Sequence, residues 1–232
     1  MSELVRRVTA DVEALSDPKK VADHRRYFRE EIETYGLAMP DVKKIAAKYY
    51  KELKDDLPRA MDLTEKLLQT RNLTLSDVGI HMLKRYKRHI KGAYFPRFDR
   101  WVDFLTNWAN TDNLCCGIIA LSVKDDPSHI ESLVKWTGSE NRWRRRAAAV
   151  SLVPIVRKGD LFEDSFRIAN RLMTDGDDMV QKGVGWMLKE ASKVHPNEIH
   201  EYLVKWKPDA PALTLRYASE KLPKELKVYK TR

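Results

Sequence analysis

The chain has 232 residues, of which 43% are hydrophobic and 33% charged, and it carries a formal net charge of +9 with a pI near 9.4. This composition excludes a disordered chain, and no apolar run approaches the length of a membrane span. The excess of lysine and arginine favours a polyanionic partner, either nucleic acid or an acidic membrane face.

The N-terminal residues and the two cysteines bear on the compartment. Residues 1–18 contain no apolar signal core, so we expect no secretory leader. Cys115 and Cys116 are adjacent and cannot staple a fold of this size, and their neighbours Leu114 and Ile118 indicate buried thiols in a reducing compartment. We therefore expect a cytoplasmic protein.

Apolar residues recur at helical spacing along nearly the whole chain, with no convincing alternating strand. Breaks are predicted, in chain order, at residues 16–18, 35–41, 55–58, 74–77, 94–96, 110–113, 125–128, 137–140, 158–160, 175–178, 195–197 and 208–211. Two breaks fall in each span of roughly 35–40 residues, which is typical of stacked helix pairs. We predict an all-α protein, with residues 1–232 forming a single domain: a curved solenoid of HEAT-like antiparallel helix pairs with a basic concave surface. A helical bundle is the alternative.

Residues 79–92 contain the first of three basic segments. Met82, Leu83, Tyr86 and Ile90 are spaced to pack inward. The opposite face carries cations at spacings of 3, 4 and 3, namely His81, Lys84, Arg88 and Lys91. A single stripe of this kind is usually a solvated face.

Residues 107–116 contain the acidic candidate. Trp108 is predicted to end one helix, residues 110–113 to form a turn, and Asp112 to enter the next helix. An aspartate in a first turn commonly caps the helix, which is the simpler interpretation. The alternative is a single carboxylate beside an aromatic wall in a basic groove.

The densest positive cluster lies in residues 139–156. With Ser139 as the predicted N-cap, Arg142, Arg144, Arg145 and Arg146 fall in the first two turns, around Trp143. The partial positive charge of a helix N-terminus repels cations. We expect a ligand phosphate to supply the missing counter-charge.

A third basic stripe lies on the helix predicted for residues 177–196. Its apolar face consists of Val180, Val184, Met187, Leu188, Ala191 and Val194. Lys182, Trp186, Lys189 and Lys193 lie on the opposite side at spacings of 4, 3 and 4. The indole could simply cover a neighbouring helix, but aromatic rings among cations suit contacts to sugars and bases.

The sequence lacks the motifs of several common nucleotide-binding, metal-binding and serine-hydrolase sites. It contains no GxxxxGK[ST] phosphate loop, no GxGxxG fingerprint, no HExxH or CxxC pair and no GxSxG elbow. We therefore expect no metal and no nucleotide cofactor.

The chain resembles the AlkD-like family of DNA alkylation repair glycosylases, which have HEAT-like repeats and remove alkylated purines from DNA. The resemblance is carried by "RYFREEIETYGLAMPDVKKI" near the start, "LKRYKRHI" at 83–90, "NWANTD" at 107–112, "ENRWRRRAA" at 140–148 and "VQKGVGWMLKE" at 180–190. It implies that Asp112 is the catalytic aspartate and that Trp108, Arg146 and Trp186 complete the active site. The DNA-binding set that we predict consists of Arg142, Arg145, Lys182, Lys189, Lys193, Lys84, Arg88, Lys91 and Tyr27.

Two positions depart from the family pattern. Lys189 stands where the family often has arginine, and lysine can neutralise a phosphate but cannot form a bidentate contact with it. Ala38 stands where a polar residue is common, which indicates one lost contact to DNA.

The implied function is hydrolysis of the N-glycosidic bond of N3- or N7-alkylated purines, such as 3-methyladenine and 7-methylguanine, in duplex DNA. Asp112 would stabilise the oxocarbenium-like sugar or orient water, and the resemblance implies no base flipping and no strand cleavage. The expected partner is double-stranded DNA with alkylated purines, without a membrane, a cofactor or an obligatory protein partner. The alternatives are a non-catalytic repeat protein that binds nucleic acid and a protein–protein scaffold.

Overall fold

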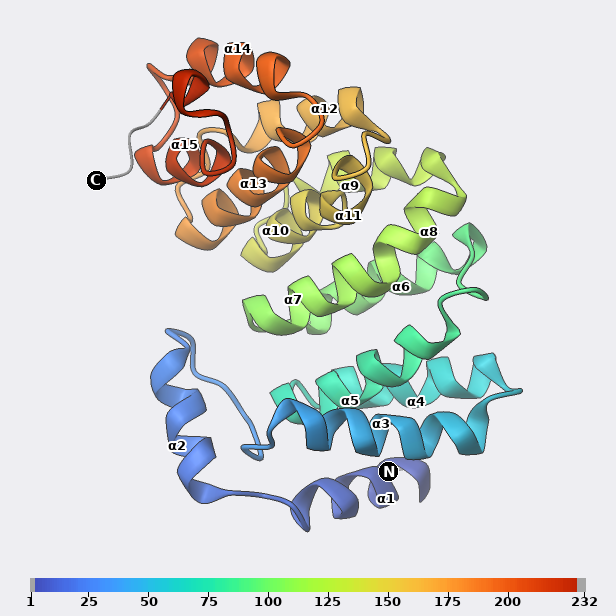
Figure 1. The fold of residues 1–232 in the computed structure, drawn as a ribbon. Coiled ribbons are helices and arrows are strands. Elements are labelled where there is room, and N and C mark those ends of the chain that lie inside the picture. Colours follow the sequence, from blue (N-terminus) through green and yellow to red (C-terminus); the bar gives the residue numbers. More distant parts are fainter. Residues whose placement is uncertain (1–2, 229–232) are drawn as a thin grey trace. The chain divides into compact units, whose positions relative to one another are not determined.

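The computed structural model describes residues 3–228, and these residues are helical throughout apart from turns and one isolated bridge. The prediction of an all-α protein is confirmed. The chain divides into two compact units, one ending at Ile118 and the other beginning at Ile119 (Figure 1). The single domain and the basic concave surface stay predictions.

Unit 1 is built around α5. Its helices are α1 (Glu3–Glu13), α2 (Pro18–Tyr27), α3 (Met39–Leu53), α4 (Leu57–Gln69), α5 (Leu73–Leu83), α6 (Phe95–Trp101) and α7 (Trp108–Leu114). α3 and α4 both pack against α5 (Figure 1). Side chains of Asp17, Asp56, Asn72 and Asn107 cap the starts of α2, α4, α5 and α7 by accepting hydrogen bonds from backbone N–H groups.

The segment between α2 and α3 fixes the beginning of α5. Leu73 donates its backbone N–H to the carbonyl of Glu33 at 2.7 Å, and the Tyr35 N–H binds Thr74 Oγ1 at 3.1 Å. Thr34 and Thr74 also share a hydrogen bond through their hydroxyl groups. These contacts hold residues 33–35, which follow α2, against the first turn of α5.

The core of unit 1 explains the inward-facing residues. Met82, Leu83, Tyr86 and Ile90 are all buried, as predicted.

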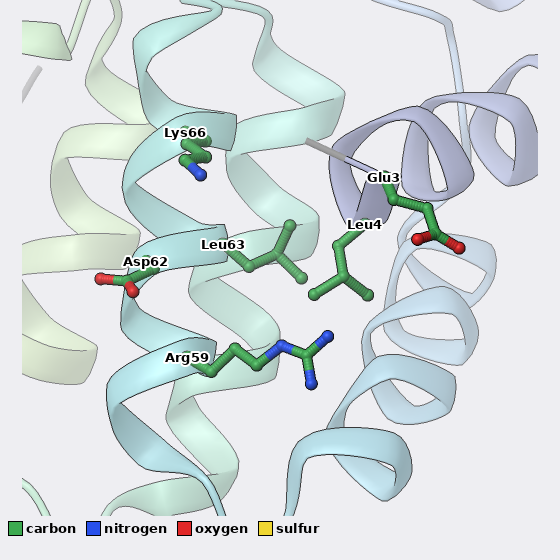
Figure 2. A pocket seen from close by; sticks show the side chains of 6 residues that line it. All are labelled: Glu3, Leu4, Arg59, Asp62, Leu63 and Lys66. Atoms are coloured by element: carbon green, nitrogen blue, oxygen red, sulfur yellow. The ribbon is translucent and has the colours of Figure 1, made fainter. Parts of the chain in front are cut away.

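A surface pocket of about 270 Å³ lies between α1 and α4 (Figure 2), and it is lined by Glu3, Leu4, Arg59, Asp62, Leu63 and Lys66. Acidic and basic side chains therefore share this pocket.

In unit 2, α13 packs against five other helices. The unit contains α8 (Ala120–Asp125), α9 (Ile130–Trp136), α10 (Arg142–Val150), α11 (Val153–Val156), α12 (Phe162–Leu172), α13 (Asp178–Ala191), α14 (Pro196–Trp206) and α15 (Ala212–Ala218). These neighbours of α13 are α10, α11, α12, α14 and α15. Gly185 permits the close approach of α15, because a Cβ atom there would lie 2.4 Å from Tyr217 Cβ.

Two predicted breaks are wrong. Residues 74–77 lie inside α5 and residues 110–113 lie inside α7. Thr74, Asp77 and Asn110 are buried and hydrogen-bonded there, so these polar residues bind neighbouring segments instead of ending helices. The other predicted breaks coincide with the ends or beginnings of helices.

None of the helices in residues 3–228 is both long and apolar enough to cross a membrane.

Candidate nucleic-acid site

α7 presents Trp108 and Asp112 on one face. The two residues are four positions apart, and both are partly exposed. Asn107 is the N-cap, because its Oδ1 accepts the Asn110 N–H at 2.9 Å. The prediction that Trp108 ends a helix and Asp112 begins the next is wrong, since Trp108 begins α7 and Asp112 lies in its second turn. The structure therefore excludes the simpler interpretation of Asp112 as a helix cap.

Aromatic rings surround Trp108. The ring of Phe28 stacks on its indole with centroids 5.5 Å apart, and Tyr27 meets it edge-on at 6.0 Å. Phe28, Ile32 and Leu73 form the apolar cluster beneath the indole. Tyr27 is 71% exposed, so this aromatic group reaches solvent beside α7.

A buried polar network holds α7 against α5. Asp77 Oδ1 accepts hydrogen bonds from Asn110 Nδ2 at 3.1 Å and from Asn113 Nδ2 at 2.8 Å. Lys84 Nζ donates to Asn113 Oδ1 at 2.6 Å, so Asn113 bridges the acid and the base. Asp77 is only 6% exposed, and burial raises the pKa of its carboxyl group to about 6. Sequence analysis missed this network, although an acid within the apolar run 73–83 was a signal.

Lys84 does not lie on a solvated stripe. α5 ends at Leu83 and a 3₁₀ turn follows, so His81, Lys84, Arg88 and Lys91 do not form a continuous helical face, contrary to the prediction. The Lys84 side chain crosses Gly117, where a Cβ atom would lie 2.2 Å from Lys84 Cε. Burial lowers the pKa of its amine. Arg88 and Lys91 are exposed.

Gly117 belongs to a π-helical turn, Cys115–Ile119, that directly follows α7. Single π-turns inside helices are frequent at functional sites because they change the direction of the side chains around them. Cys115 is buried and Cys116 partly so, and both are free thiols. No group of three or more His, Cys, Asp or Glu side chains within residues 3–228 could hold a metal ion.

In unit 2, aspartates neutralise much of the arginine cluster of α10. Arg142 Nε lies 3.1 Å from Asp177 Oδ2, and Arg145 Nε donates to Asp175 Oδ2 at 2.7 Å. Arg145 Nη1 also donates to the backbone carbonyls of Ser139 and Glu140 at 2.9 and 3.1 Å. The hydrogen bond to Asp175 raises the pKa of Arg145. The chain itself therefore supplies counter-charge that we expected from a ligand.

The N-cap of α10 is Asn141, and not Ser139 as predicted. Asn141 Oδ1 accepts the Trp143 N–H at 2.9 Å, while Ser139 Oγ accepts the N–H of Asn141 itself. The arginines still fall in the first turns.

Arg146 is only 5% exposed. Its guanidinium donates to the backbone carbonyl of Met179. Its side chain packs on Gly183 of α13, where a Cβ atom would lie 3.2 Å from Arg146 Cγ. α10 and α13 are therefore joined through this arginine.

Three members of the predicted stripe, Lys182, Trp186 and Lys189, lie on α13, and each lysine of the stripe has an acidic partner. Lys182 Nζ lies 3.0 Å from Asp178, Lys189 Nζ lies 3.2 Å from Glu220, and Lys193 Nζ lies 2.6 Å from Glu190. Trp186 is partly buried between the first two lysines. Lys193 follows the end of the helix, and Val194 is exposed, contrary to its predicted place on the apolar face.

The predicted site residues thus fall into two groups. Tyr27, Trp108, Asp112 and Lys84 lie on or beside α7 in unit 1. The group in unit 2 comprises Arg142, Arg145, Arg146, Lys182, Trp186, Lys189 and Lys193, on or just after α10 and α13. Ala38 precedes α3 and gives that helix no side-chain cap.

Comparisons with known proteins identify relatives of this fold. Residues 8–222 match the family described as DNA alkylation repair enzyme. A predicted DNA alkylation repair enzyme from Enterococcus faecalis has a similar structure, with a TM-score of 0.77 and 19% identity over 90% of this chain and 97% of that one. Comparison with curated protein sequences gives no significant match.

Two further structures are similar at lower scores. The structure of smu.31 from Streptococcus mutans UA159 has a TM-score of 0.57 and 19% identity, covering 80% of this chain and 93% of that chain. The alkylpurine DNA glycosylase AlkC of Pseudomonas fluorescens, bound to DNA containing an abasic site analog, has a TM-score of 0.56 and 18% identity. That match covers 93% of this chain and 61% of AlkC.

Proposed function

Because the chain belongs to the family of DNA alkylation repair enzymes, we propose that it is a DNA glycosylase for N3- or N7-alkylated purines in duplex DNA. One observation above all supports this proposal: Asp112 shares the partly exposed face of α7 with Trp108 and does not serve as a cap. Asn107 provides the N-terminal cap of α7, so the position of Asp112 beside Trp108 is not explained by capping and supports a role in chemistry.

The chemistry needs only one carboxylate. Glycosidases usually need a second carboxyl group to protonate the leaving group. A purine alkylated at N3 or N7 is already cationic and departs as a neutral base. Asp112 would stabilise positive charge developing at the sugar C1′ or orient the attacking water. At 4 Å and an effective dielectric near 20, this attraction is about 4 kcal/mol, or nearly three decades in rate.

Aromatic and cationic side chains would hold the DNA. Trp108 would present its π face to the sugar, with Tyr27 contacting the backbone at its edge, and Trp186 of unit 2 would also contact the DNA. The resemblance implies that Arg146 holds a phosphate beside the lesion, and for this its guanidinium would have to leave the buried position in which it donates to the Met179 carbonyl. The DNA phosphates would also contact the cations on or just after α10 and α13, namely Arg142, Arg145, Lys182, Lys189 and Lys193, and the exposed Arg88 and Lys91.

We expect hydrolysis without strand cleavage or base flipping, in the cytoplasm. A lyase would need an amine that attacks C1′ as a nucleophile. Lys84, the lysine bonded to α7, donates its amine to Asn113. Trapping with borohydride should therefore give no covalent protein–DNA product, and a trapped product lost in Lys84→Ala would contradict this expectation.

The decisive experiment measures release of 7-methylguanine or 3-methyladenine from methylated duplex DNA in single turnovers. Asp112→Asn should lower the rate by about two to three decades without a comparable loss of DNA binding. Asp55→Asn is the matched control, since its side chain is 89% exposed between α3 and α4. Equal rates for Asp112→Asn and the unaltered protein would refute the catalytic assignment. Binding of DNA with no release of base by the unaltered protein would instead indicate a non-catalytic DNA-binding protein.

A further inference from the structure

A second pocket in unit 1 is lined by basic side chains alone. It measures about 220 Å³ and its lining consists of Lys43, His81, Lys84 and Arg85. Lys43 lies on α3 and His81 on α5, which pack side by side (Figure 1), while Lys84 and Arg85 begin the 3₁₀ turn after α5. Two helices and one turn thus bring four basic residues to one opening.

The charge of this pocket distinguishes it from two other pockets in the described part of unit 1. The pocket in Figure 2 contains Glu3 and Asp62 beside its cations. Another pocket, near Arg97 and Arg100, contains Asp62 and Glu65. The basic pocket has no acid in its lining. Asp77 acts on Lys84 but is buried on the side of α7, where it accepts hydrogen bonds from Asn110 and Asn113.

The imidazole of His81 is affected by burial and by the positive charges around it. Its Nε2 is buried and has no hydrogen-bond partner among the described residues. A buried polar atom without a partner is unfavourable, because it has lost its hydrogen bonds to water. Burial, followed by the charges of Lys84, Lys43 and Arg85, lowers the pKa of the imidazole to about 4. A neutral imidazole can still donate one N–H to an anion.

Arg85 is held in place from outside the pocket. Its guanidinium carbon lies 5.6 Å from the ring centroid of Tyr50, a cation–π contact that restricts the long side chain. Lys84 is similarly restricted by its hydrogen bond to Asn113 and its passage over Gly117. Ordered cations lose less conformational entropy when an anion binds.

We propose that Lys43, His81, Lys84 and Arg85 form a binding site for a phosphate group of the DNA backbone. This inference rests on the proposed function for the identity of the ligand. The phosphate oxygens would accept hydrogen bonds from Lys43, Arg85 and the imidazole of His81. Because Lys84 also bonds Asn113 of α7, a phosphate in this pocket would set the register of the DNA relative to the helix that carries Asp112.

The first test measures the salt dependence of binding to an undamaged duplex oligonucleotide by fluorescence anisotropy. The variant is the double substitution Lys43→Gln and Arg85→Gln, both at exposed positions. Losing one neutralised phosphate should reduce the slope of log K against log salt by about 0.9 and weaken binding about eightfold at 0.1 M salt. Lys66→Gln, in the mixed-charge pocket of Figure 2, is the control and should leave the slope unchanged. An unchanged slope in the double variant would overturn the inference.

The second test identifies the source of the phosphate. The ring proton signal of His81, one of six histidines, is assigned by comparison with His81→Gln and followed by NMR. Addition of the duplex should shift this signal in the unaltered protein and not in the double variant. A shift with inorganic phosphate and none with DNA would overturn the DNA assignment in favour of a free phosphate compound.

Base release separates this inference from the proposed function. If the double variant has a reduced salt slope but the unaltered protein releases no alkylated purine, the glycosylase proposal fails and the phosphate site stands. If base is released while the double variant binds with the normal slope, the phosphate site fails and the glycosylase proposal stands.

Discussion

The buried carboxyl group of Asp77 allows a quantitative test of the network behind α7. Asp77→Asn keeps an oxygen that can accept from Asn110 and Asn113 but removes the titrating group. In the folded protein, burial outweighs the hydrogen bonds and the charge of Lys84, so the pKa of Asp77 rises from 3.8 to about 6. The variant therefore isolates the energetic cost of ionising this side chain.

The sign of the effect follows from proton linkage. A raised pKa means that the folded state holds the proton more tightly than the unfolded state. The contribution of Asp77 to stability is full below pH 3.8 and is lost as the pH rises through 6. The total is about 3 kcal/mol, of which about 2 kcal/mol is lost between pH 4 and pH 7.5.

Urea denaturation of both proteins at pH 4 and pH 7.5 measures this difference. The stability of Asp77→Asn relative to the unaltered protein should rise by about 2 kcal/mol over that interval. His81, whose lowered pKa acts in the opposite direction, is present in both proteins and cancels. A relative stability that is independent of pH, or that falls with pH, would show that Lys84 holds Asp77 ionised and would refute the reasoning.

Three further predictions concern contacts described above. Gly117→Ala should lower the Tm by about 2–4 °C, since the new Cβ atom would displace Lys84, and adding Lys84→Ala should remove part of this loss. An unchanged Tm would contradict that packing. Arg145→Gln should destabilise the protein by about 2 kcal/mol in urea denaturation, and Asp175→Asn should cost less in that variant than alone, whereas additive losses would count against the pair. Trp108→Ala should slow base release about 2- to 30-fold and Trp108→Phe much less, because the phenyl ring keeps a π face; equal rates for all three proteins would exclude this role.

The sequence was sufficient to predict the helical class and most of the helix boundaries. Proline, glycine and capping residues mark these boundaries locally, as at Asp17, Asp56 and Asp177. The prediction failed where such residues are used for tertiary hydrogen bonds. Thr74 and Asn110 resemble helix breakers in the sequence, yet each lies within a helix and binds a neighbouring segment.

The candidate site was also predictable only in part, because local spacing can be read from the sequence and contacts between distant segments cannot. The spacing of Trp108 and Asp112 places both on one face of any helix that contains them, although the predicted boundary was wrong. The partners of the arginines were not predictable, because Asp175 lies 30 residues after Arg145 and reaches it only through the packing of α13 on α10. Asp77 and Asn113 were missed because their hydrogen bonds join separate helices.

The carboxylates paired with the lysines on and just after α13 affect how the protein behaves among other polyanions. A phosphate that binds Lys182, Lys189 or Lys193 must displace the carboxylate paired with that lysine. The binding free energy gained is therefore only the difference between the two ion pairs. Three such pairs amount to about 1–2 kcal/mol, roughly a factor of ten in affinity. The protein should therefore elute from heparin at a lower ionic strength than its charge of +9 suggests. Its non-specific affinity for RNA and other polyanions should be reduced in the same proportion.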